Sequence, residues 1–179
     1  LSDAIRSHRG TVDKYIGDAI MAFWGAPQDD ADHVRHACEG ALAMKARLAE
    51  LQASWDARGL PRLETRIGLN TGDVLVGNFG AATRLNYTVM GDPVNLASRL
   101  ENLNKRYGTG IIVGQATAER VKEHFVFRPL EWVAVKGKSQ GVLIHELVGR
   151  RGEVDDAALA AIAAYRDALE LYRARRFAE

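Results

Sequence analysis

Two short apolar stretches meet around a carboxylate in the segment TVDKYIGDAIMAFWG, residues 11–25. Gly17 tolerates a positive φ, so Gly17 and Asp18 suit a two-residue hairpin turn that holds Asp18 at the end of a strand. Carboxylate oxygens are ligands that suit Mg²⁺ and Mn²⁺, although an aspartate at a turn also shapes its own loop. The pattern predicts a metal ligand at Asp18, with a structural turn residue as the alternative.

A guanidinium and an amide are expected on one helical face in the segment NYTVMGDPVNLASR, residues 86–99. Asp92 suits the N-cap and Pro93 the first helical position, so Asn95 and Arg99 fall at i and i+4. An arginine fork matches phosphate oxygens, and an asparagine can donate to and accept from sugar hydroxyls. The pair therefore predicts a phosphate and ribose clamp, with a solvated polar pair as the alternative. A separate apolar stripe is expected at Val94, Ala97, Leu100 and Leu103.

Three ordered blocks, VDKYIGDAIMAFWG, YTVMGDPVNLASRL and VKGK, closely resemble the class III nucleotidyl cyclases, the family that makes cyclic AMP or cyclic GMP. The resemblance covers most of residues 1–150, and it is strongest to the bacterial homodimeric adenylyl cyclases. It implies a catalytic domain that converts ATP to 3′,5′-cyclic AMP and pyrophosphate for intracellular signalling. Guanylyl cyclase is the alternative within the enzyme class.

The resemblance implies that two residues recognise the base. Lys14 falls on the lysine found in enzymes that use ATP, and an ammonium can donate to N1 of adenine, whereas guanine would call for an acceptor. Thr88 aligns with the second base-recognition position, where many members carry aspartate, and its hydroxyl can accept from the adenine amino group. This threonine implies a bacterial subgroup, some of whose members respond to bicarbonate. Without the resemblance, Lys14 would be an exposed strand lysine.

The other aligned residues imply the chemistry. Asp18 falls on one of two aspartates that hold two Mg²⁺ or Mn²⁺ ions against the triphosphate, Asn95 on the ribose-orienting asparagine, and Arg99 on the transition-state arginine. In the implied reaction the ribose 3′-oxygen attacks the α-phosphorus in line and pyrophosphate leaves. Lys136 aligns with the lysine that meets the outer phosphates, although a Lys-Gly-Lys turn is otherwise a solvated loop.

The resemblance also implies a homodimer. In the family two domains pair head to tail, and each site combines metal aspartates from one protomer with base-recognition residues from the other. The matching residues all occur in this chain, which implies two equivalent sites. The family's first metal aspartate lies on an opening strand well before the second, but only 17 residues precede Asp18. We therefore expect the chain to lack that strand and part of the first helix, and to be inactive by itself.

Hydrophobic periodicity predicts an α/β domain of the α+β kind over residues 1–150. A ferredoxin-like mixed, mainly antiparallel sheet with flanking helices is expected. Helices are expected at the first residues, at 29–58, after Asp92 and at 116–124, with a short strand at 110–113. Strands 64–70 and 73–79 are expected to pair mid-sheet around Thr71-Gly72, followed by a loop over 80–85, and 125–135 is expected to pair with 141–148.

Residues 151–179 are expected to carry a C-terminal amphipathic helix over 155–177. Its sequence looks like the opening of a tetratricopeptide repeat, which implies helical-repeat partners, and the alternative is a terminal helix that packs on the domain or its partner. Its apolar stripe is expected at Ala158, Ile162, Tyr165, Leu169 and Tyr172.

Composition narrows the setting. The net charge of +1, with dispersed basic residues, argues against a nucleic-acid partner. One cysteine, Cys38, excludes a disulfide framework within the chain and favours a cytoplasmic location. A membrane anchor in a preceding region of a longer protein stays open.

Two functions of other classes compete with the enzyme. One is a degenerate nucleotide-binding dimerisation module that regulates an attached partner without turnover. The other is a scaffold, in which the tail binds helical-repeat partners and nucleotide is irrelevant.

Overall fold

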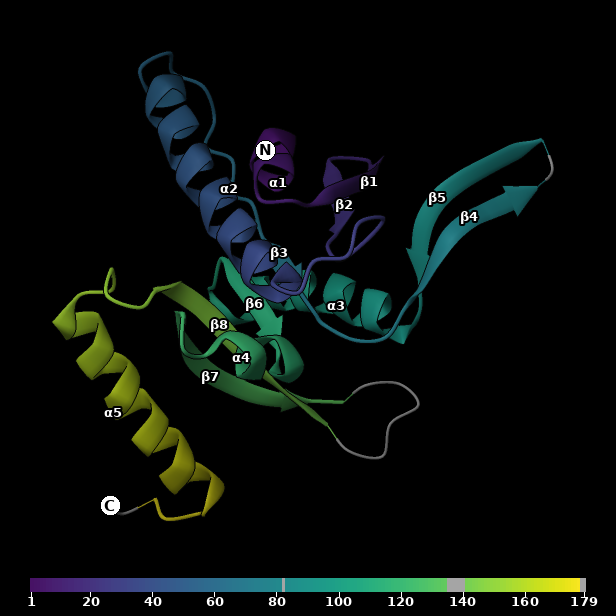
Figure 1. The fold of residues 1–179 in the computed structure, drawn as a ribbon. Coiled ribbons are helices and arrows are strands. Elements are labelled where there is room, and N and C mark those ends of the chain that lie inside the picture. The colour runs from purple at the N-terminus through teal and green to yellow at the C-terminus, as the bar shows by residue number, and fades with distance from the viewer. Residues whose placement is uncertain (82, 135–140, 178–179) are drawn as a thin grey trace.

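The computed structural model describes residues 1–81, 83–134 and 141–177 (Figure 1). The elements, in chain order, are α1 (Ser2–Ser7), β1 (Thr11–Ile16), β2 (Ala19–Phe23), α2 (His33–Asp56), β3 (Ile67–Leu69), β4 (Leu75–Ala81), β5 (Arg84–Met90), α3 (Asp92–Tyr107), β6 (Ile111–Gly114), α4 (Gln115–Val121), β7 (Phe125–Val133), β8 (Val142–Arg150) and α5 (Asp156–Arg173).

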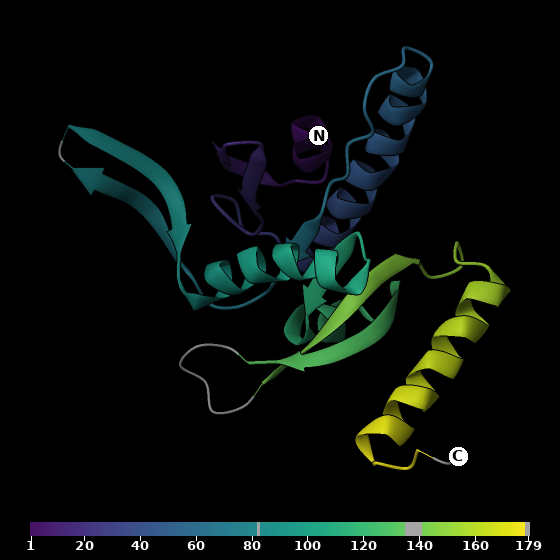
Figure 2. The same ribbon diagram turned by 180° about the vertical axis from the view of Figure 1, so that it is seen from behind.

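The central element is a mixed four-stranded sheet in the order β3-β6-β8-β7. Strand β3 runs parallel to β6, and β8 runs antiparallel to both β6 and β7. Helix α3 packs on one face of this sheet, and α2 and α4 pack on the other (Figures 1 and 2). The predicted α+β class, with a mainly antiparallel sheet and flanking helices, is confirmed.

Strand β6 explains why both faces are covered. Its alternating side chains point to opposite faces, and all of them are buried. Ile112 packs with Leu96 and Leu100 of α3, whereas Ile111 and Val113 join the larger cluster under α2 and α4. A strand buried on both sides must be apolar at successive positions, as Ile111–Val113 is.

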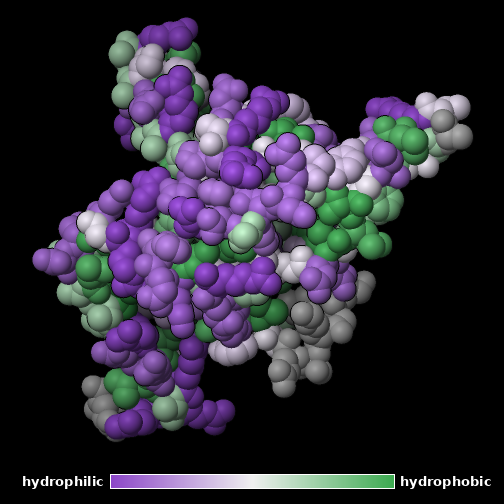
Figure 3. Space-filling model, in the orientation of Figure 1, coloured by the Kyte–Doolittle hydropathy of each residue, from purple (hydrophilic) through white to green (hydrophobic). Residues whose placement is uncertain are grey.

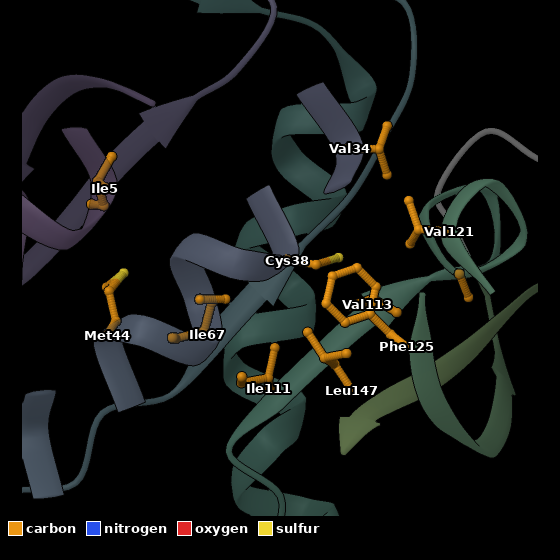
Figure 4. Packing of buried hydrophobic residues seen from close by; sticks show 12 residues of the cluster. Ile5, Val34, Cys38, Met44, Ile67, Ile111, Val113, Val121, Phe125 and Leu147 are labelled. Carbon is orange, nitrogen blue, oxygen red and sulfur yellow. The ribbon is translucent and has the colours of Figure 1, made fainter. Parts of the chain in front are cut away.

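The larger cluster gathers Cys38, Val113, Phe125 and Leu147 around one centre (Figure 4). Cys38 lies on the buried stripe of α2, as predicted, and is fully buried. Burial raises the pKa of its thiol to about 12, and the adjacent Glu39 carboxylate adds to the effect. Cys38 is therefore a packing residue with little thiolate character.

Gly68 lets α3 lie directly against β3. A Cβ added at Gly68 would lie 2.1 Å from the backbone oxygen of Ala97 and 2.4 Å from the backbone nitrogen of Glu101. Only a residue without a side chain fits there. This close approach fixes the helix that carries Asn95 and Arg99 onto the central sheet.

The predicted hairpin around Thr71-Gly72 is wrong. Strand β3 pairs with β6 instead, and β4 pairs with β5, from Leu75↔Met90 to Ala81↔Arg84. The expected loop over 80–85 is therefore mostly strand, and the β4–β5 hairpin projects from the body as a separate arm rather than lying mid-sheet (Figures 1 and 2). Local alternation could not reveal a parallel pairing with a strand more than forty residues away.

The C-terminal helix was predicted correctly as an element. Asp155 caps α5 by accepting a hydrogen bond from the backbone N–H of Ala158 at 2.7 Å. None of the residues of α5 is buried, and its clearest tie to the sheet is the Arg128 guanidinium, 4.9 Å from the centre of the Tyr165 ring. Helix α5 thus lies beside the domain as a loosely packed element (Figure 2).

Across the described ranges, which omit 82, 135–140 and 178–179, we find no helix both long and apolar enough to cross a membrane.

Candidate functional site

The β1–β2 hairpin places Asp18 at its tip. Gly17 adopts a φ of +62° in the turn, and Asp18 follows it directly at an exposed position. The side chain of Asp18 has no hydrogen bond or ion pair to any other described residue. The predicted turn geometry is confirmed, and the carboxylate is free to bind a ligand from solvent.

Lys14 and Thr88 lie together, although 74 positions separate them. The Lys14 Nζ donates to Thr88 Oγ1 at 3.3 Å, joining β1 to the body end of β5. Thr88 is 5% exposed, whereas the Lys14 side chain is 42% exposed. The structure thus brings together the two residues that were predicted to recognise the base, and the Lys14 ammonium is the more exposed of the two groups.

A third residue completes this group, and sequence reasoning missed it. Asp13 accepts a short hydrogen bond from Thr88 Oγ1, and its Oδ1 lies 3.4 Å from Lys14 Nζ. Its side chain is only 2% exposed. We call Asp13, Lys14 and Thr88 the polar triad.

A β-bulge makes the polar triad possible. Neighbouring residues of a regular strand point to opposite faces, so Asp13 and Lys14 would not be expected to share a partner. The register against β2 shifts between Val12 and Lys14, which leaves Asp13 without a cross-strand partner. No turn residue or glycine in the sequence signals this bulge.

Asn95 and Arg99 occupy exposed positions on α3, one turn apart. Neither side chain has a hydrogen bond or ion pair within the part of the chain that the structure describes. They face away from the apolar contacts that hold α3 on the sheet, as predicted. Both groups are therefore available to a ligand.

Two details of α3 differ from the predictions. The N-cap is Gly91, with a φ of +149°, and Asp92 is the first helical residue, without a side-chain capping hydrogen bond. The buried stripe runs through Leu96, Leu100 and Asn104 instead of through Val94 and Ala97. Asn104 is buried because its amide donates to the backbone oxygens of Ile67 and Leu100, which satisfies a polar group inside the core.

The described residues supply one candidate metal ligand. They contain no group of three or more His, Cys, Asp or Glu side chains that could hold an ion. A single carboxylate such as that of Asp18 suits Mg²⁺, because proteins often bind this ion through only one or two carboxylates together with phosphates of the substrate. Lys136, the predicted ligand of the outer phosphates, lies outside the described residues.

Comparison with known proteins identifies the family. The model of the adenylate and guanylate cyclase catalytic domain matches residues 3–149. The chain belongs to this family.

The cyclase domain is 44% identical over 148 residues to adenylate cyclase 1 of Rhizobium meliloti, an alignment that covers 83% of this chain and 22% of that protein. It is 36% identical over 154 residues to the adenylate cyclase of Anabaena cylindrica, covering 82% of this chain and 30% of that one. The chain thus spans less than a third of the length of these relatives.

Solved structures agree with this assignment. The crystal structure of the adenylyl cyclase CyaB from P. aeruginosa matches with a TM-score of 0.76 and 36% identity, covering 86% of this chain and 79% of that chain. The guanylyl cyclase Cya2 matches with a TM-score of 0.75 and 34% identity, covering 87% and 77%. The predicted resemblance to class III cyclases is confirmed. An adenylyl and a guanylyl cyclase match almost equally well, so the cyclase domain's choice of base must be argued from its side chains.

The arm of the cyclase domain exposes an apolar surface. Hydrophobic residues gather where the β4–β5 hairpin leaves the body (Figure 3). Leu75 is 71% exposed and Met90, its partner in the register, 49% exposed. On the opposite face of the hairpin, a hollow of about 480 Å³ is lined by Val74, Val76 and Val89 together with residues 23–26, 29–31 and 33. We call the exposed apolar residues of β4 and β5 the arm patch, which has Leu75 and Met90 on one face of the hairpin and Val76, Leu85 and Tyr87 on the other.

Proposed function

We propose that this domain is an adenylyl cyclase that converts ATP to 3′,5′-cyclic AMP and pyrophosphate. The observation that carries the choice of ATP is the contact between Lys14 and Thr88. It presents an ammonium donor beside a hydroxyl oxygen, and adenine offers an acceptor at N1 beside a donor at its amino group. The curated relatives named above are both adenylate cyclases, which supports the same choice.

Asn95 and Arg99 supply the proposed clamp on the sugar and the phosphates. The Asn95 amide would orient the ribose, so that the 3′-oxygen lies in line with the α-phosphorus. The Arg99 guanidinium would donate to the oxygens on which charge develops as the bond to pyrophosphate breaks. Their exposure and their lack of partners among the described residues leave both free for these roles. Lys136 is proposed to meet the outer phosphates.

Asp18 is the proposed metal ligand. A Mg²⁺ or Mn²⁺ ion bound there would neutralise phosphate charge and favour ionisation of the 3′-oxygen. The family pattern calls for two ions, and Asp18 accounts for one carboxylate of that site. Its position at the end of a stiff hairpin would fix the carboxylate while leaving its oxygens open to the triphosphate.

We also propose that a second copy of the chain completes each site. Asp18 has no hydrogen bond or ion pair to the polar triad in one chain, although it lies only four positions after Lys14. The arm patch offers an apolar surface that a partner would cover, and a two-fold homodimer buries such a surface on both copies. The site would then combine Asp18 of one copy with the polar triad and α3 of the other.

The test is product formation by the full-length protein, with ATP and with GTP, in Mn²⁺ and then in Mg²⁺. We expect cyclic AMP, and we expect Asp18→Ala and Arg99→Ala each to lower its rate by about 10²- to 10³-fold. Asp3→Ala is the matched control, because Asp3 lies on α1 with a fully exposed side chain and should leave the rate unchanged.

Two outcomes would contradict the proposal in different ways. A clear preference for GTP would make the protein a guanylyl cyclase, like the similar structure Cya2, and would overturn the assignment of the base. Nucleotide binding by a folded dimer without any cyclic product would favour a regulatory module and make Asp18 a turn residue.

The C-terminal helix supports a further proposal about partners. Leu159, Tyr165 and Tyr172 of α5 are all exposed, which suits a helix that packs against helical-repeat partners. Deletion of residues 153–179 should then abolish binding of such a partner and leave nucleotide binding intact. A cytoplasmic location is proposed from the ATP substrate and the single buried cysteine.

A further inference from the structure

Asp13 is a buried carboxylate for which the proposed function has no role. Its side chain is 2% exposed, and it contacts both residues that are proposed to recognise the base. Burying a carboxylate is costly unless it is paired and hydrogen-bonded, and Asp13 is both. We infer that Asp13 is a positioning residue for nucleotide selectivity, which holds Lys14 as a donor and Thr88 as an acceptor toward the base. The inference rests on the proposed function.

The hydrogen-bond roles within the polar triad follow from the chemistry of its members. A carboxylate can only accept, and an ammonium can only donate. The single proton of the Thr88 hydroxyl is therefore committed to Asp13, while one lone pair of Oγ1 accepts from Lys14. The remaining lone pair makes Thr88 an acceptor for any further partner. Two contacts also anchor the Lys14 ammonium, and its third N–H can donate outward.

This polarity distinguishes the two purines. The edge of adenine presents its amino donor beside the N1 acceptor, whereas guanine presents the O6 acceptor beside an N1–H donor. A lysine donor beside a threonine acceptor matches adenine at both positions and guanine at neither. Without Asp13 the Thr88 hydroxyl could rotate and donate to O6, and Lys14 would lose its anchor. Loss of the Asp13 carboxylate should therefore relax selectivity toward guanine.

The test is the ratio of affinities for an adenine and a guanine nucleotide. The probes are 3′-deoxy-ATP and 3′-deoxy-GTP, which lack the attacking oxygen, so binding is measured without turnover. Asp13→Asn keeps the shape of the side chain and removes the charge. It should lower the ratio of the two affinities by about 3- to 10-fold, the effect of one hydrogen bond. In a background that carries both Lys14→Met and Thr88→Val, which removes both residues that Asp13 positions, the same substitution should leave the ratio unchanged.

Two further variants separate positioning from folding. Asp30→Asn is the matched control, because Asp30 also has a nearly buried side chain, 8% exposed, that pairs with Arg9 and His36. It should leave the ratio unchanged. If Asp13→Asn fails to fold, Thr88→Ser and Thr88→Val provide the second measurement. Serine retains the hydroxyl that Asp13 orders and should keep the ratio, whereas valine should lower it.

Three results would overturn the inference. The first is an unchanged ratio in Asp13→Asn or, if Asp13→Asn does not fold, an unchanged ratio in Thr88→Val. The second is an equal fall of the ratio in the background that carries both Lys14→Met and Thr88→Val, because Asp13 would then act through folding. The third is failure of the native protein to bind either nucleotide. Formation of cyclic AMP is measured separately, so an active enzyme whose ratio does not depend on Asp13 contradicts this inference alone.

Discussion

The central sheet and the β4–β5 arm place similar residues in opposite environments. In the sheet, leucine, isoleucine and valine side chains are buried between helices, as Leu147 and Ile144 are at 3% and 0% exposure. In the arm, Leu75 and Leu85 are 71% and 58% exposed. Burying a leucine side chain contributes about 1.5–3 kcal/mol. The sheet gains this stabilisation within one chain, whereas the arm can gain it only from another molecule.

The central sheet and the arm also have different roles in the candidate site. Sheet β3-β6-β8-β7 fixes α3 through Gly68 and through the cluster around Leu100, which holds Asn95 and Arg99 in place. The arm carries Thr88, one of the two buried residues of β5, near its body end, and it exposes apolar side chains on both sides of Thr88 along the strands. The rigid part thus positions the proposed clamp, while the extended part links the base-recognition residues to the proposed dimer contact.

The largest expected effect is a difference in stability between two leucine-to-alanine substitutions, one in the central sheet and one in the arm. Leu147→Ala in β8 should lower the free energy of unfolding by about 2–5 kcal/mol, because it removes buried methyl groups and leaves a cavity. Leu85→Ala in the arm should change it by no more than about 0.5 kcal/mol. Urea unfolding, at a protein concentration low enough for monomers, measures both. Equal losses would mean that the arm is packed as tightly as the core.

How well the sequence predicts the fold depends on how far apart in the chain the contacting residues lie. The β1–β2 turn at Gly17-Asp18, the long helix α2 and the pairing of β7 with β8 follow from local turn residues and local periodicity, and all are confirmed. The hairpin predicted around Thr71-Gly72 is wrong, because β3 finds its partner across the α3 crossover. Short alternating stretches do not indicate which distant strand they pair with.

The candidate site shows the same limit. Asp18, Asn95 and Arg99 were placed from local motifs, and the structure puts them on the hairpin tip and the helical face that those motifs predict. Their roles remain predictions. Asp13 could not be found in this way, because its partner Thr88 is 75 positions away and the bulge that turns Asp13 toward Thr88 has no local signal.

A smaller effect is expected from a charge placed on the arm. Leu75→Glu should weaken self-association by about tenfold or more, since a partner that covers the arm patch would bury an unpaired carboxylate. Leu63→Glu is the matched control, because Leu63 is also exposed, at 58%, but lies outside the arm. Sedimentation equilibrium measures the dissociation constant of each variant. Unchanged association in Leu75→Glu would show that the arm patch is not the contact between copies.

The smallest expected effect concerns the stability of the protein in acid, and it arises from a residue of the central sheet. His145 of β8 has a buried Nδ1 without a hydrogen-bond partner among the described residues. Burial lowers the pKa of this imidazole, while nearby Glu119 opposes the shift and Arg173 adds to it. The unfolded chain therefore binds a proton more readily than the folded one, so stability is retained above the ordinary pKa of about 6.5 and falls as the pH drops below it. Between pH 7 and pH 5, the native protein should lose more thermal stability than His145→Gln, which cannot titrate there. A loss of the same size in both proteins would assign the acid sensitivity to other groups.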